Sequence, residues 1–587
     1  MLEIQNISVN YSKSGKPAFE NFSLAVKQGE ICCLVGESGS GKTSVIRAVM
    51  GNLSGQGRVA QGDIFFEGES LLSYTANDWR KIYGTEISMI FQDSGAMLNP
   101  IRTIGSQFVE YICAHGDYRR KEAWEKGVQM LECACLPDGE HIMKSYPFQL
   151  SGGMKQRVGI AFAMIFKPKL LLADEPTSAL DITMQAQMIR QMMKLREEYG
   201  TSIIMITHNL ALAAYMSDHI VVMKDGKITD SGDRDHILHN SQAEYTKKLL
   251  SAVPSLGGYF MFEPDDLIIE ARHLTKSYQR SGNRILTACD DVSLNFYKSR
   301  TLGIVGESGC GKSTFMRMAV GLEKPTSGEI LFHGKNITER KGEELRRNRR
   351  NIQMIFQDPG EAFHPRMKVK KIICEPLLNF NLIKKNQMDS KARELLEMVE
   401  LPGSFAERYP HDMSGGQRQR IGIARALALE PEVIICDEIT SALDVSVQQT
   451  IVELLLDLQK RKQISIGFIS HDLALVQQFA HQIAVMYLGN VVEILSGKEV
   501  STKAAHPYTQ ALLDSIFDLQ MDFSKEIVSM DSEIPSPLNV PEGCPFQNRC
   551  NHCMDVCRAE KPGLWEVEPN HLVACHQFNR FKNREDK

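Results

Sequence analysis

The chain has 587 residues, more than one hydrophobic core usually supports, so several domains are expected. Hydrophobic residues make up 43% of the composition and charged residues 24%, and the formal net charge of −5 argues against a generally basic nucleic-acid-binding protein. The longest apolar run, VGIAFAMIF at 158–166, is far shorter than the roughly 18 residues that a membrane span needs.

The beginning of the sequence and its cysteines bear on the cellular compartment. The N-terminal residues MLEIQNISVN lack the basic and then apolar pattern of a secretory signal. We therefore expect the chain to stay in the cytoplasm. The 14 cysteines would be kept there mostly as thiols, outside any metal cluster.

Five motifs of the first half recur in the second half. GESGSGKTS at position 36 returns as GESGCGKST at 306, IFQDSG as IFQDPG, SGGMKQRVGIA as SGGQRQRIGIA, DEPTSALD as DEITSALD, and THNLAL as SHDLAL. The repeat predicts two copies of one domain, at 1–253 and 267–519. The stretch 254–266, with its Pro, Gly and acidic residues, is expected to be a linker, and 520–587 is an unduplicated, cysteine-rich C-terminal segment.

Each half contains a glycine-rich loop of the form G-x-x-x-x-G-K-[ST]. In the first half it lies between a buried strand predicted for ICCLV at 31–35 and a helix predicted for SVIRAVM at 44–50. Such a loop turns several backbone N–H groups toward one point at a helix N-terminus, where a polyphosphate binds favourably. The lysine adds a positive charge, and Thr43 or Ser313 after it supplies a magnesium ligand. The predicted nucleotide-binding residues of the two loops are Gly36, Ser38, Gly39, Ser40, Gly41, Lys42, Thr43 and Ser44, and Gly306, Ser308, Gly309, Cys310, Gly311, Lys312, Ser313 and Thr314.

Two further apolar runs, LLLADE and VIICDE, end in an Asp-Glu pair. Asp174 and Asp437 are placed to hold magnesium through water, and Glu175 and Glu438 to orient or deprotonate an attacking water. The alternative is an acidic pair that only caps a loop.

A histidine ends one β-rich run in each half, SIIMIT before His208 and SIGFIS before His471. Alone, either residue would read as an ordinary polar side chain at a strand end. Their equal spacing in the two halves favours contact with the γ-phosphate.

Together these motifs resemble the ATP-binding cassette superfamily, and the resemblance covers both halves. The phosphate loop is shared with many nucleotide hydrolases, so the Ser-Gly-Gly signature of LSGGM and MSGGQ is the most specific element. HPYTQALL at 506–513, the weaker AEYTKKLL at 243–250 and the terminal cysteines resemble the ATPases of dipeptide, oligopeptide and nickel importers. The chain looks like two such ATPases fused.

The resemblance implies an α/β fold with two tandem cassettes. Each would have a RecA-like parallel-sheet core, a small antiparallel β lobe and a helical lobe that carries the signature. The cassettes would stack head to tail, with ATP between the phosphate loop of one and the signature of the other. Hydrolysis would then release the closed pair.

The resemblance also implies roles for residues outside the phosphate loops. Gln92 and Gln357 would sense the γ-phosphate and its magnesium ion and move the groove that receives a membrane partner. Tyr11 and Tyr278 would stack on adenine, although a tyrosine on a β-rich segment is otherwise a common core or surface residue. The signature residues that would face the opposite γ-phosphate or ribose are Ser151, Gly153, Ser414, Gly416 and Gln417.

For function, the resemblance implies the ATPase of an importer, for di- or oligopeptides or alternatively for nickel or a metallophore. Its partners would be two transmembrane permease subunits and an extracytoplasmic substrate-binding protein, with no nucleic acid, and it would sit peripherally on the cytoplasmic face of the membrane. The alternatives of another class are a soluble twin-cassette translation factor and a ribosome-recycling protein. Relatives of the translation factor usually carry a long charged linker between their cassettes. The ribosome-recycling protein is of a type with an N-terminal cysteine-rich domain.

Four cysteines of the C-terminal segment, Cys544, Cys550, Cys557 and Cys575, have the spacing C-x5-C-x6-C-x17-C. The resemblance implies a [4Fe–4S] cluster with a structural role, because some importer ATPases hold one there. Zinc bound by four thiolates, or with His552 or His576, is an alternative. Disulfides are disfavoured by the compartment, and free thiols would make the crowding accidental. Cys553 is an additional thiol that leaves the ligand set open.

Cys310 lies inside the second phosphate loop. A thiol among backbone N–H groups at a helix N-terminus is expected to have a lowered pKa and raised reactivity. Alkylation is therefore expected to inhibit the protein, and bound ATP to protect it.

The two halves depart from the family pattern at different motifs. Pro176 follows the first predicted catalytic glutamate, whereas Ile439 follows the second. Gln417 ends the second signature, whereas Met154 ends the first. Head-to-tail pairing would put both departures in the site that contains Glu438. Proline fixes φ after the base, and methionine cannot hydrogen-bond a ribose, so this site is expected to turn over more slowly.

This asymmetry predicts that Glu175→Gln removes the greater part of ATP hydrolysis and that Glu438→Gln removes less. The measurement is the steady-state ATPase rate of the two purified variants at saturating ATP. Equal losses would show that the departures have no effect on turnover.

Overall fold

The computed structural model describes residues 1–11, 17–134, 136, 138–177, 180–258, 260–280, 284–441, 443–528, 530, 538 and 540–579. Position 259 of the predicted linker and positions 178, 179 and 442 of the SALD motifs lie outside these residues. The chain forms two compact units. The first consists of Met1–Val253, Asp444–Ser446 and Ser515–Glu533, and the second of Pro254–Leu443, Val447–Asp514 and Ile534–Lys587.

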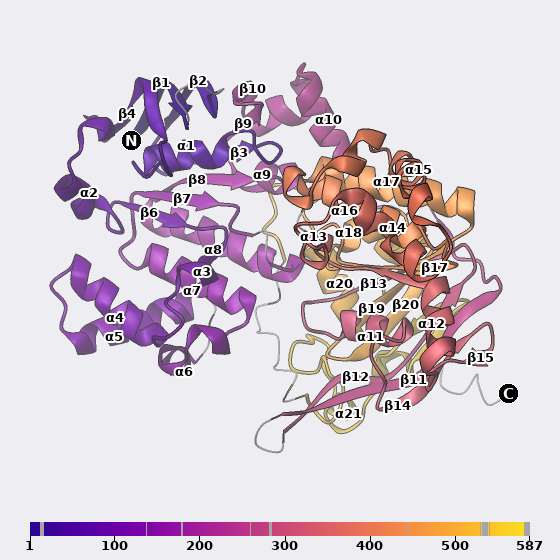
Figure 1. Cartoon of the computed structure of the whole chain (residues 1–587). Helices are drawn as coiled ribbons and strands as arrows, with labels where there is room; N and C mark the ends of the chain where they lie inside the picture. Colours follow the sequence, from indigo (N-terminus) through magenta and orange to yellow (C-terminus); the bar gives the residue numbers. More distant parts are fainter. Residues whose placement is uncertain are drawn as a thin grey trace. The chain divides into compact units, whose positions relative to one another are not determined.

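The first unit contains an antiparallel sheet and a mostly parallel core sheet (Figure 1). The antiparallel sheet has the order β2 (Phe19–Val26), β1 (Leu2–Asn10), β4 (Arg58–Phe66), β5 (Glu69–Ser70). The core sheet has the order β10 (Lys227–Gly232), β9 (His219–Lys224), β3 (Ile31–Val35), β8 (Ser202–Thr207), β7 (Leu170–Asp174), β6 (Ile87–Ile90). Its neighbouring strands from β9 to β6 pair in parallel, and β10 pairs antiparallel to β9.

The helices of the first unit cover the core sheet and form a separate lobe. They are α1 (Lys42–Val49), α2 (Ala76–Ile82), α3 (Ser94–Met97), α4 (Ile104–His115), α5 (Arg120–Cys133), α6 (Gly139–Lys144), α7 (Gly152–Met164), α8 (Ile182–Tyr199), α9 (Leu210–Met216) and α10 (Glu244–Ala252). Apolar side chains of α1 pack with both sheets into one core. Those of α4 to α7 form a second core, which gives the helical lobe its own stability.

The central strands read as continuous apolar runs because both of their faces are covered. Every residue of β3, β7 and β8 is buried, as parallel strands between layers require. The strand predicted for ICCLV therefore matches β3, whereas the following helix begins at Lys42, two residues before the predicted start.

The second unit repeats this plan. Its antiparallel sheet has the order β12 (Arg284–Tyr297), β11 (Leu267–Arg280), β14 (Ser327–Phe332), β15 (Lys335–Asn336). Its core sheet has the order β16 (Ile352–Ile355), β17 (Val433–Asp437), β18 (Ser465–Ser470), β13 (Thr301–Val305), β19 (Gln482–Tyr487), β20 (Asn490–Ser496), β22 (His571–Val573), β21 (Trp565–Glu568). The predicted α/β fold, written twice with a small antiparallel sheet in each copy, is confirmed.

The helices of the second unit correspond to most of those of the first, with α19 (Val500–Lys503) and α21 (Asp555–Ala559) in addition. They are α11 (Lys312–Ala319), α12 (Gly342–Asn351), α13 (Pro359–Ala362), α14 (Val369–Asn379), α15 (Met388–Met398), α16 (Gly415–Leu427), α17 (Val445–Lys462), α18 (Leu473–Gln477), α19 (Val500–Lys503), α20 (Pro507–Asp514) and α21 (Asp555–Ala559). Within the described residues, no helix of either unit is long and apolar enough to cross a membrane.

The cysteine-rich segment is built onto the second core sheet. Its strand β22 pairs antiparallel with β20, Glu493 opposite Val573 and Ile494 opposite Leu572, and β21 continues the sheet. The fully buried Glu493 carboxylate contacts His571 of the segment at 2.8 Å. The segment therefore shares a hydrogen-bonded sheet with the second unit.

The stretch Ser515–Glu533 follows α20 of the second unit in the chain but belongs to the first unit. Its Ile527 N–H donates to the Tyr215 hydroxyl of α9 at 2.9 Å. Gln187 of α8 donates to the Met530 carbonyl, and Arg190 of the same helix pairs with Glu526. The first unit is thus completed by residues from near the end of the chain.

Candidate nucleotide sites

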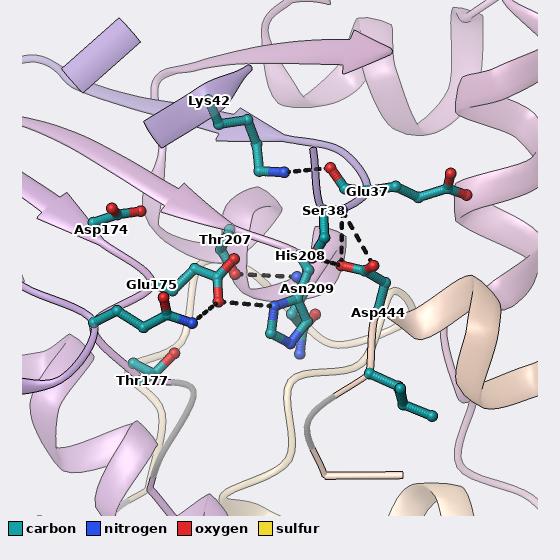
Figure 2. Close-up of polar contacts among 12 residues, drawn as sticks. Glu37, Ser38, Lys42, Asp174, Glu175, Thr177, Thr207, His208, Asn209 and Asp444 are labelled. Atoms are coloured by element: carbon teal, nitrogen blue, oxygen red, sulfur yellow. Dashed lines mark hydrogen bonds and ion pairs between the residues drawn. The ribbon is translucent and has the colours of Figure 1, made fainter. Parts of the chain in front are cut away.

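The first phosphate loop joins the carboxyl end of β3 to α1. Gly41 caps the helix with φ of 100°, and Lys42 is its first residue. Lys42 is 5% exposed, and its ammonium donates to the carbonyl of Gly36 at 2.7 Å. It also donates to the carbonyl of Glu37 at 2.7 Å (Figure 2). The ammonium is thus satisfied by the loop that it follows, and it lies where the loop can present it to phosphate.

Two loop glycines are required by close packing, and a third faces open space. A Cβ on Gly36 would lie 2.2 Å from the Met223 carbonyl oxygen, and one on Gly41 would lie 2.8 Å from that of Ala18. A Cβ on Gly39 would meet nothing within 4 Å. The inner side of the loop is therefore pressed against the protein while its outer side is open, as a loop that receives a ligand needs.

Polar side chains gather where β7 and β8 end, beside this loop. The Thr43 hydroxyl donates to the Asp174 carboxylate at 3.1 Å. The Gln92 amide donates to the Glu175 carboxylate at 3.0 Å, and His208 Nδ1 lies 3.8 Å from the same carboxylate (Figure 2). Parallel strands bring these residues together because their carboxyl ends meet at one edge of the sheet.

The second unit reproduces the arrangement. The Lys312 ammonium donates to the carbonyls of Gly306 and Glu307 at 2.7 and 2.9 Å. Ser313 donates to Asp437 at 2.7 Å, and the Gln357 amide donates to Glu438 at 3.1 Å.

The remaining predicted residues of the second unit lie at the same edge. His471 follows β18, at the position that His208 has after β8. Glu175 and Glu438 both have positive φ, 45° and 48°, a backbone conformation that non-glycine residues rarely adopt. The two predicted catalytic glutamates therefore share the same strained backbone conformation.

Burial shapes the electrostatics of both sites. It raises the pKa of Asp174 and of Asp437, partly offset by the hydrogen bond from Thr43 or Ser313. It also lowers the pKa of the Lys42 ammonium. Bound anionic phosphates would favour the charged lysine, and a cation would favour the charged aspartates.

The donor set fits Mg²⁺ bound together with a nucleotide. Within the described residues, no three His, Cys, Asp or Glu side chains are gathered so that they could hold a metal ion by themselves. Mg²⁺ is usually bound by one or two protein groups together with substrate phosphates. Thr43 with Asp174, and Ser313 with Asp437, provide such partial sets.

The two signatures begin their helices differently. Ser151 caps α7 and accepts the Met154 N–H, whereas Ser414 caps α16 within a reciprocal capping box. There Gln417 accepts the Ser414 N–H at 3.1 Å and donates its own N–H to the Ser414 hydroxyl at 3.3 Å. Met154 has no polar atom for the first of these bonds, so the second signature is the more tightly capped.

The two predicted adenine-binding tyrosines lie at, or just beyond, the helix that follows their phosphate loop. The Tyr11 hydroxyl is 3.1 Å from that of Ser44. The Tyr278 hydroxyl donates to Glu323, and the Lys276 ammonium lies 5.1 Å from its ring centroid. Both rings are held near the nucleotide loops by polar contacts, and their stacking on adenine stays a prediction.

Each phosphate loop is supported by a tyrosine that was not predicted from the sequence. The Glu37 N–H donates to the Tyr245 hydroxyl at 3.1 Å, and the Glu307 N–H donates to the Tyr508 hydroxyl at 2.9 Å. Both tyrosines belong to the paired AEYT and HPYT motifs, which served only to recognise the family. Their recurrence at one place in each half was the signal that could have assigned them a role.

The predicted reactivity of Cys310 is wrong. Its side chain is 3% exposed, and burial raises the pKa of the thiol, although the nearby Lys312 charge partly offsets the rise. The helix N-terminus was expected to dominate, but loss of solvent is the larger effect for this thiol.

The predicted cysteine centre receives no support from the described geometry. Cys544, Cys557 and Cys575 are buried and Cys550 is half-buried, all as free thiols. Burial raises the pKa of Cys544 to about 12, and interaction with the other three cysteines adds to the rise, so the four share one neighbourhood. Nevertheless, the described part of the segment does not gather three possible metal ligands into a site.

Comparison with known proteins gives matches along most of the chain. The ABC transporter family model matches residues 19–178 and 289–441, and the model of the oligopeptide/dipeptide transporter C-terminal region matches 230–259 and 492–557. The chain is 38% identical over 580 residues to the glutathione import ATP-binding protein GsiA of Pectobacterium atrosepticum, which covers 92% of this chain and 93% of that protein. It is also 38% identical over 556 residues to GsiA of Escherichia coli strain K12, which covers 88% and 89%.

The burial of Cys310 predicts that N-ethylmaleimide inactivates wild type and Cys310→Ser at the same rate in nucleotide-free protein, because little thiolate forms and the sulfur is covered. ATPase activity is followed against time of alkylation, and labelled cysteines are identified by mass spectrometry. The exposed Cys113 and Cys133 should be labelled first, so Cys113→Ser/Cys133→Ser is the matched control. Protection by Cys310→Ser alone would show that the buried thiol is reached.

Proposed function

Because this chain belongs to the ABC transporter family of ATPases and carries the oligopeptide/dipeptide transporter C-terminal region in both halves, we propose that it drives the import of short peptides. ATP hydrolysis is its chemical reaction. We further propose that two transmembrane permease subunits and an extracytoplasmic substrate-binding protein complete the importer. The chain would bind the permeases from the cytoplasmic face of the membrane.

The observation that carries the proposal is the duplicated edge of the core sheet. Each unit joins a phosphate loop to an Asp-Glu pair, with a glutamine bonded to the glutamate. In each unit a tyrosine of the matched C-terminal region also holds that loop. The tyrosine contact links the peptide-importer motif to the nucleotide site, which supports a specialised importer ATPase over a generic nucleotide hydrolase.

In this mechanism each side chain has a role set by its contacts. Bound MgATP supplies the phosphoanhydride and the cation that neutralises it. Lys42 and Lys312 would bind phosphate oxygens, and Glu175 and Glu438 would orient and deprotonate water. The hydrogen bond from Gln92 fixes the Glu175 carboxylate, and that from Gln357 fixes the Glu438 carboxylate. His208 lies near enough to Glu175 to help orient its carboxylate.

Short peptides are the substrate class that the relatives favour. The curated relatives are named for glutathione import, and glutathione is a tripeptide. Nickel and metallophores, the alternatives from the sequence, have no comparable support in the matched families. We therefore propose that the importer carries di- and tripeptides, glutathione among them.

The proposal predicts that a bacterial strain lacking the gene for this chain loses uptake of labelled glutathione or dipeptides and regains it with the wild-type chain. Lys42→Ala/Lys312→Ala should not restore uptake, because each substitution removes a charged contact to phosphate that is worth about 10- to 100-fold in affinity.

Two measurements make this experiment decisive. Membrane co-purification of the double variant with the permeases separates lost catalysis from lost assembly. Labelled Ni²⁺ is the competing substrate, and nickel uptake that depends on the wild-type chain, without peptide uptake, would replace the peptide assignment. Full peptide uptake by the double variant would contradict the ATPase role.

The metal prediction for the C-terminal segment rests on the resemblance to importer ATPases and on the cysteine spacing. We propose that Cys544, Cys550, Cys557 and Cys575 bind a [4Fe–4S] cluster as a structural clamp, with no step of ATP hydrolysis assigned to it. Protein purified without oxygen should contain iron and acid-labile sulfide, and Cys550→Ser should lose both. Stoichiometric zinc without iron would overturn the cluster and leave a zinc clamp.

A further inference from the structure

The second phosphate loop has a contact that the first does not share. Its residue Glu307 is 2% exposed and is held at three points. Its N–H donates to the Tyr508 hydroxyl, and its carbonyl accepts a hydrogen bond from the Lys312 ammonium. Its carboxylate accepts two hydrogen bonds from Arg549, at 2.7 and 2.9 Å. A loop residue beside the phosphate-binding lysine is thereby fixed through both its backbone and its side chain.

Arg549 belongs to the cysteine-bearing segment, between Cys544 and Cys550. Both partners of the ion pair have side chains that are 1% exposed, and the Arg549 guanidinium lies over the ring of Tyr487 at 5.7 Å. The neighbouring Phe546 ring packs on Tyr487 and Tyr508, with centroids 5.2 and 5.5 Å away. The segment therefore packs the Arg549 guanidinium against the phosphate loop and the Phe546 ring against the tyrosine that supports the loop.

The segment is bonded to the rest of the second unit at two places that follow Arg549 in the chain, and the loop that carries Arg549 is closed by a bond within the segment. Strand β22 extends the core sheet through β20, and Lys561 pairs with Asp290 at 2.6 Å. The Cys544 N–H also bonds to the Cys557 carbonyl at 2.7 Å, which closes the loop that carries Arg549. These contacts hold the guanidinium at a fixed place in the second unit.

The first unit offers a comparison within the same molecule. Glu37 occupies the place of Glu307 and shares the tyrosine and lysine contacts, at Tyr245 and Lys42. Its side chain is only half-buried, and within the described residues no lysine or arginine forms an ion pair with it. The arginine contact therefore distinguishes the two phosphate loops.

A buried carboxylate next to a site for polyphosphate has two costs. It has lost its water, and it would repel the phosphates that the loop binds. A bidentate guanidinium neutralises the charge and fixes its geometry, whereas removal of one partner leaves the other buried and unpaired. The position of the Glu307 carbonyl, which also holds Lys312, then depends on the segment.

We propose that Arg549 is a positioning residue for the second nucleotide site, through which the cysteine-bearing segment sets the affinity of the second unit, but not of the first, for MgATP. This role rests on ATP binding by the chain and is independent of the transported substrate. It makes the segment an integral part of one of the two sites.

The test measures binding of a fluorescent ATP analogue to the full chain with one site disabled at a time. In a Lys42→Ala background, which reports the second site, Arg549→Met should weaken binding about tenfold, a typical coupling between linked groups. In a Lys312→Ala background, which reports the first site, the same substitution should change nothing. Arg549→Lys, which keeps the charge but not the bidentate fork, should recover part of the loss. Arg558→Met, an exposed arginine of the same segment, is the matched control.

Thermal unfolding of every variant separates positioning from loss of fold. If Arg549→Met does not fold, Glu307→Gln replaces the buried charge by an amide of equal size and should also weaken the second site. Adding Arg549→Met to Glu307→Gln should then cause little further loss, because the two act through one contact. Unchanged second-site binding in a folded Arg549→Met, or equal losses at both sites, would overturn the proposal.

Discussion

A buried ammonium group at the start of α1 and of α11 is the constraint on which both nucleotide sites depend. Lys42 and Lys312 are 5% and 3% exposed, so their charge must be balanced by the loops around them. The loop carbonyls do this, which forces the backbone to curl over each lysine with glycines at positive φ. Continuous apolar strands then bring the aspartates, glutamates and glutamines to the same edge of the core sheet. There the positive charge of the lysine and the negative charge of a bound phosphate compensate each other.

Much of the fold and of the nucleotide sites could be predicted because both depend on local sequence patterns. Buried parallel strands appear as apolar runs, so the strands that end at Asp174 and Asp437, and those that end just before His208 and His471, were found where LLLAD, SIIMIT and their counterparts indicated. The duplication removed the ambiguity that a single short motif would leave. The bond between Gln92 and Glu175 joins positions 83 residues apart and became visible only in the fold.

Two of the misses share a physical origin, since both depend on distant packing. Cys310 has the local setting of a reactive thiol, but burial decides its pKa. Arg549 lies 242 residues from Glu307, and nothing in its neighbourhood marks it as part of a phosphate loop. The capping role of Gln417 was readable from its spacing to Ser414, but a role toward nucleotide drew attention away from it.

The return of Ser515–Glu533 to the first unit has a consequence for how this protein is made. The first phosphate loop is synthesised early. The stretch Ser515–Glu533, which covers α8 and α9, is translated only after the whole second core sheet apart from β21 and β22. At about 5–20 residues per second, the exposed faces of these helices wait through more than 250 residues of further synthesis. The order of translation therefore links the two halves: the first cannot finish folding until nearly all of the second exists, so a prematurely ended chain leaves the first unit without its cover.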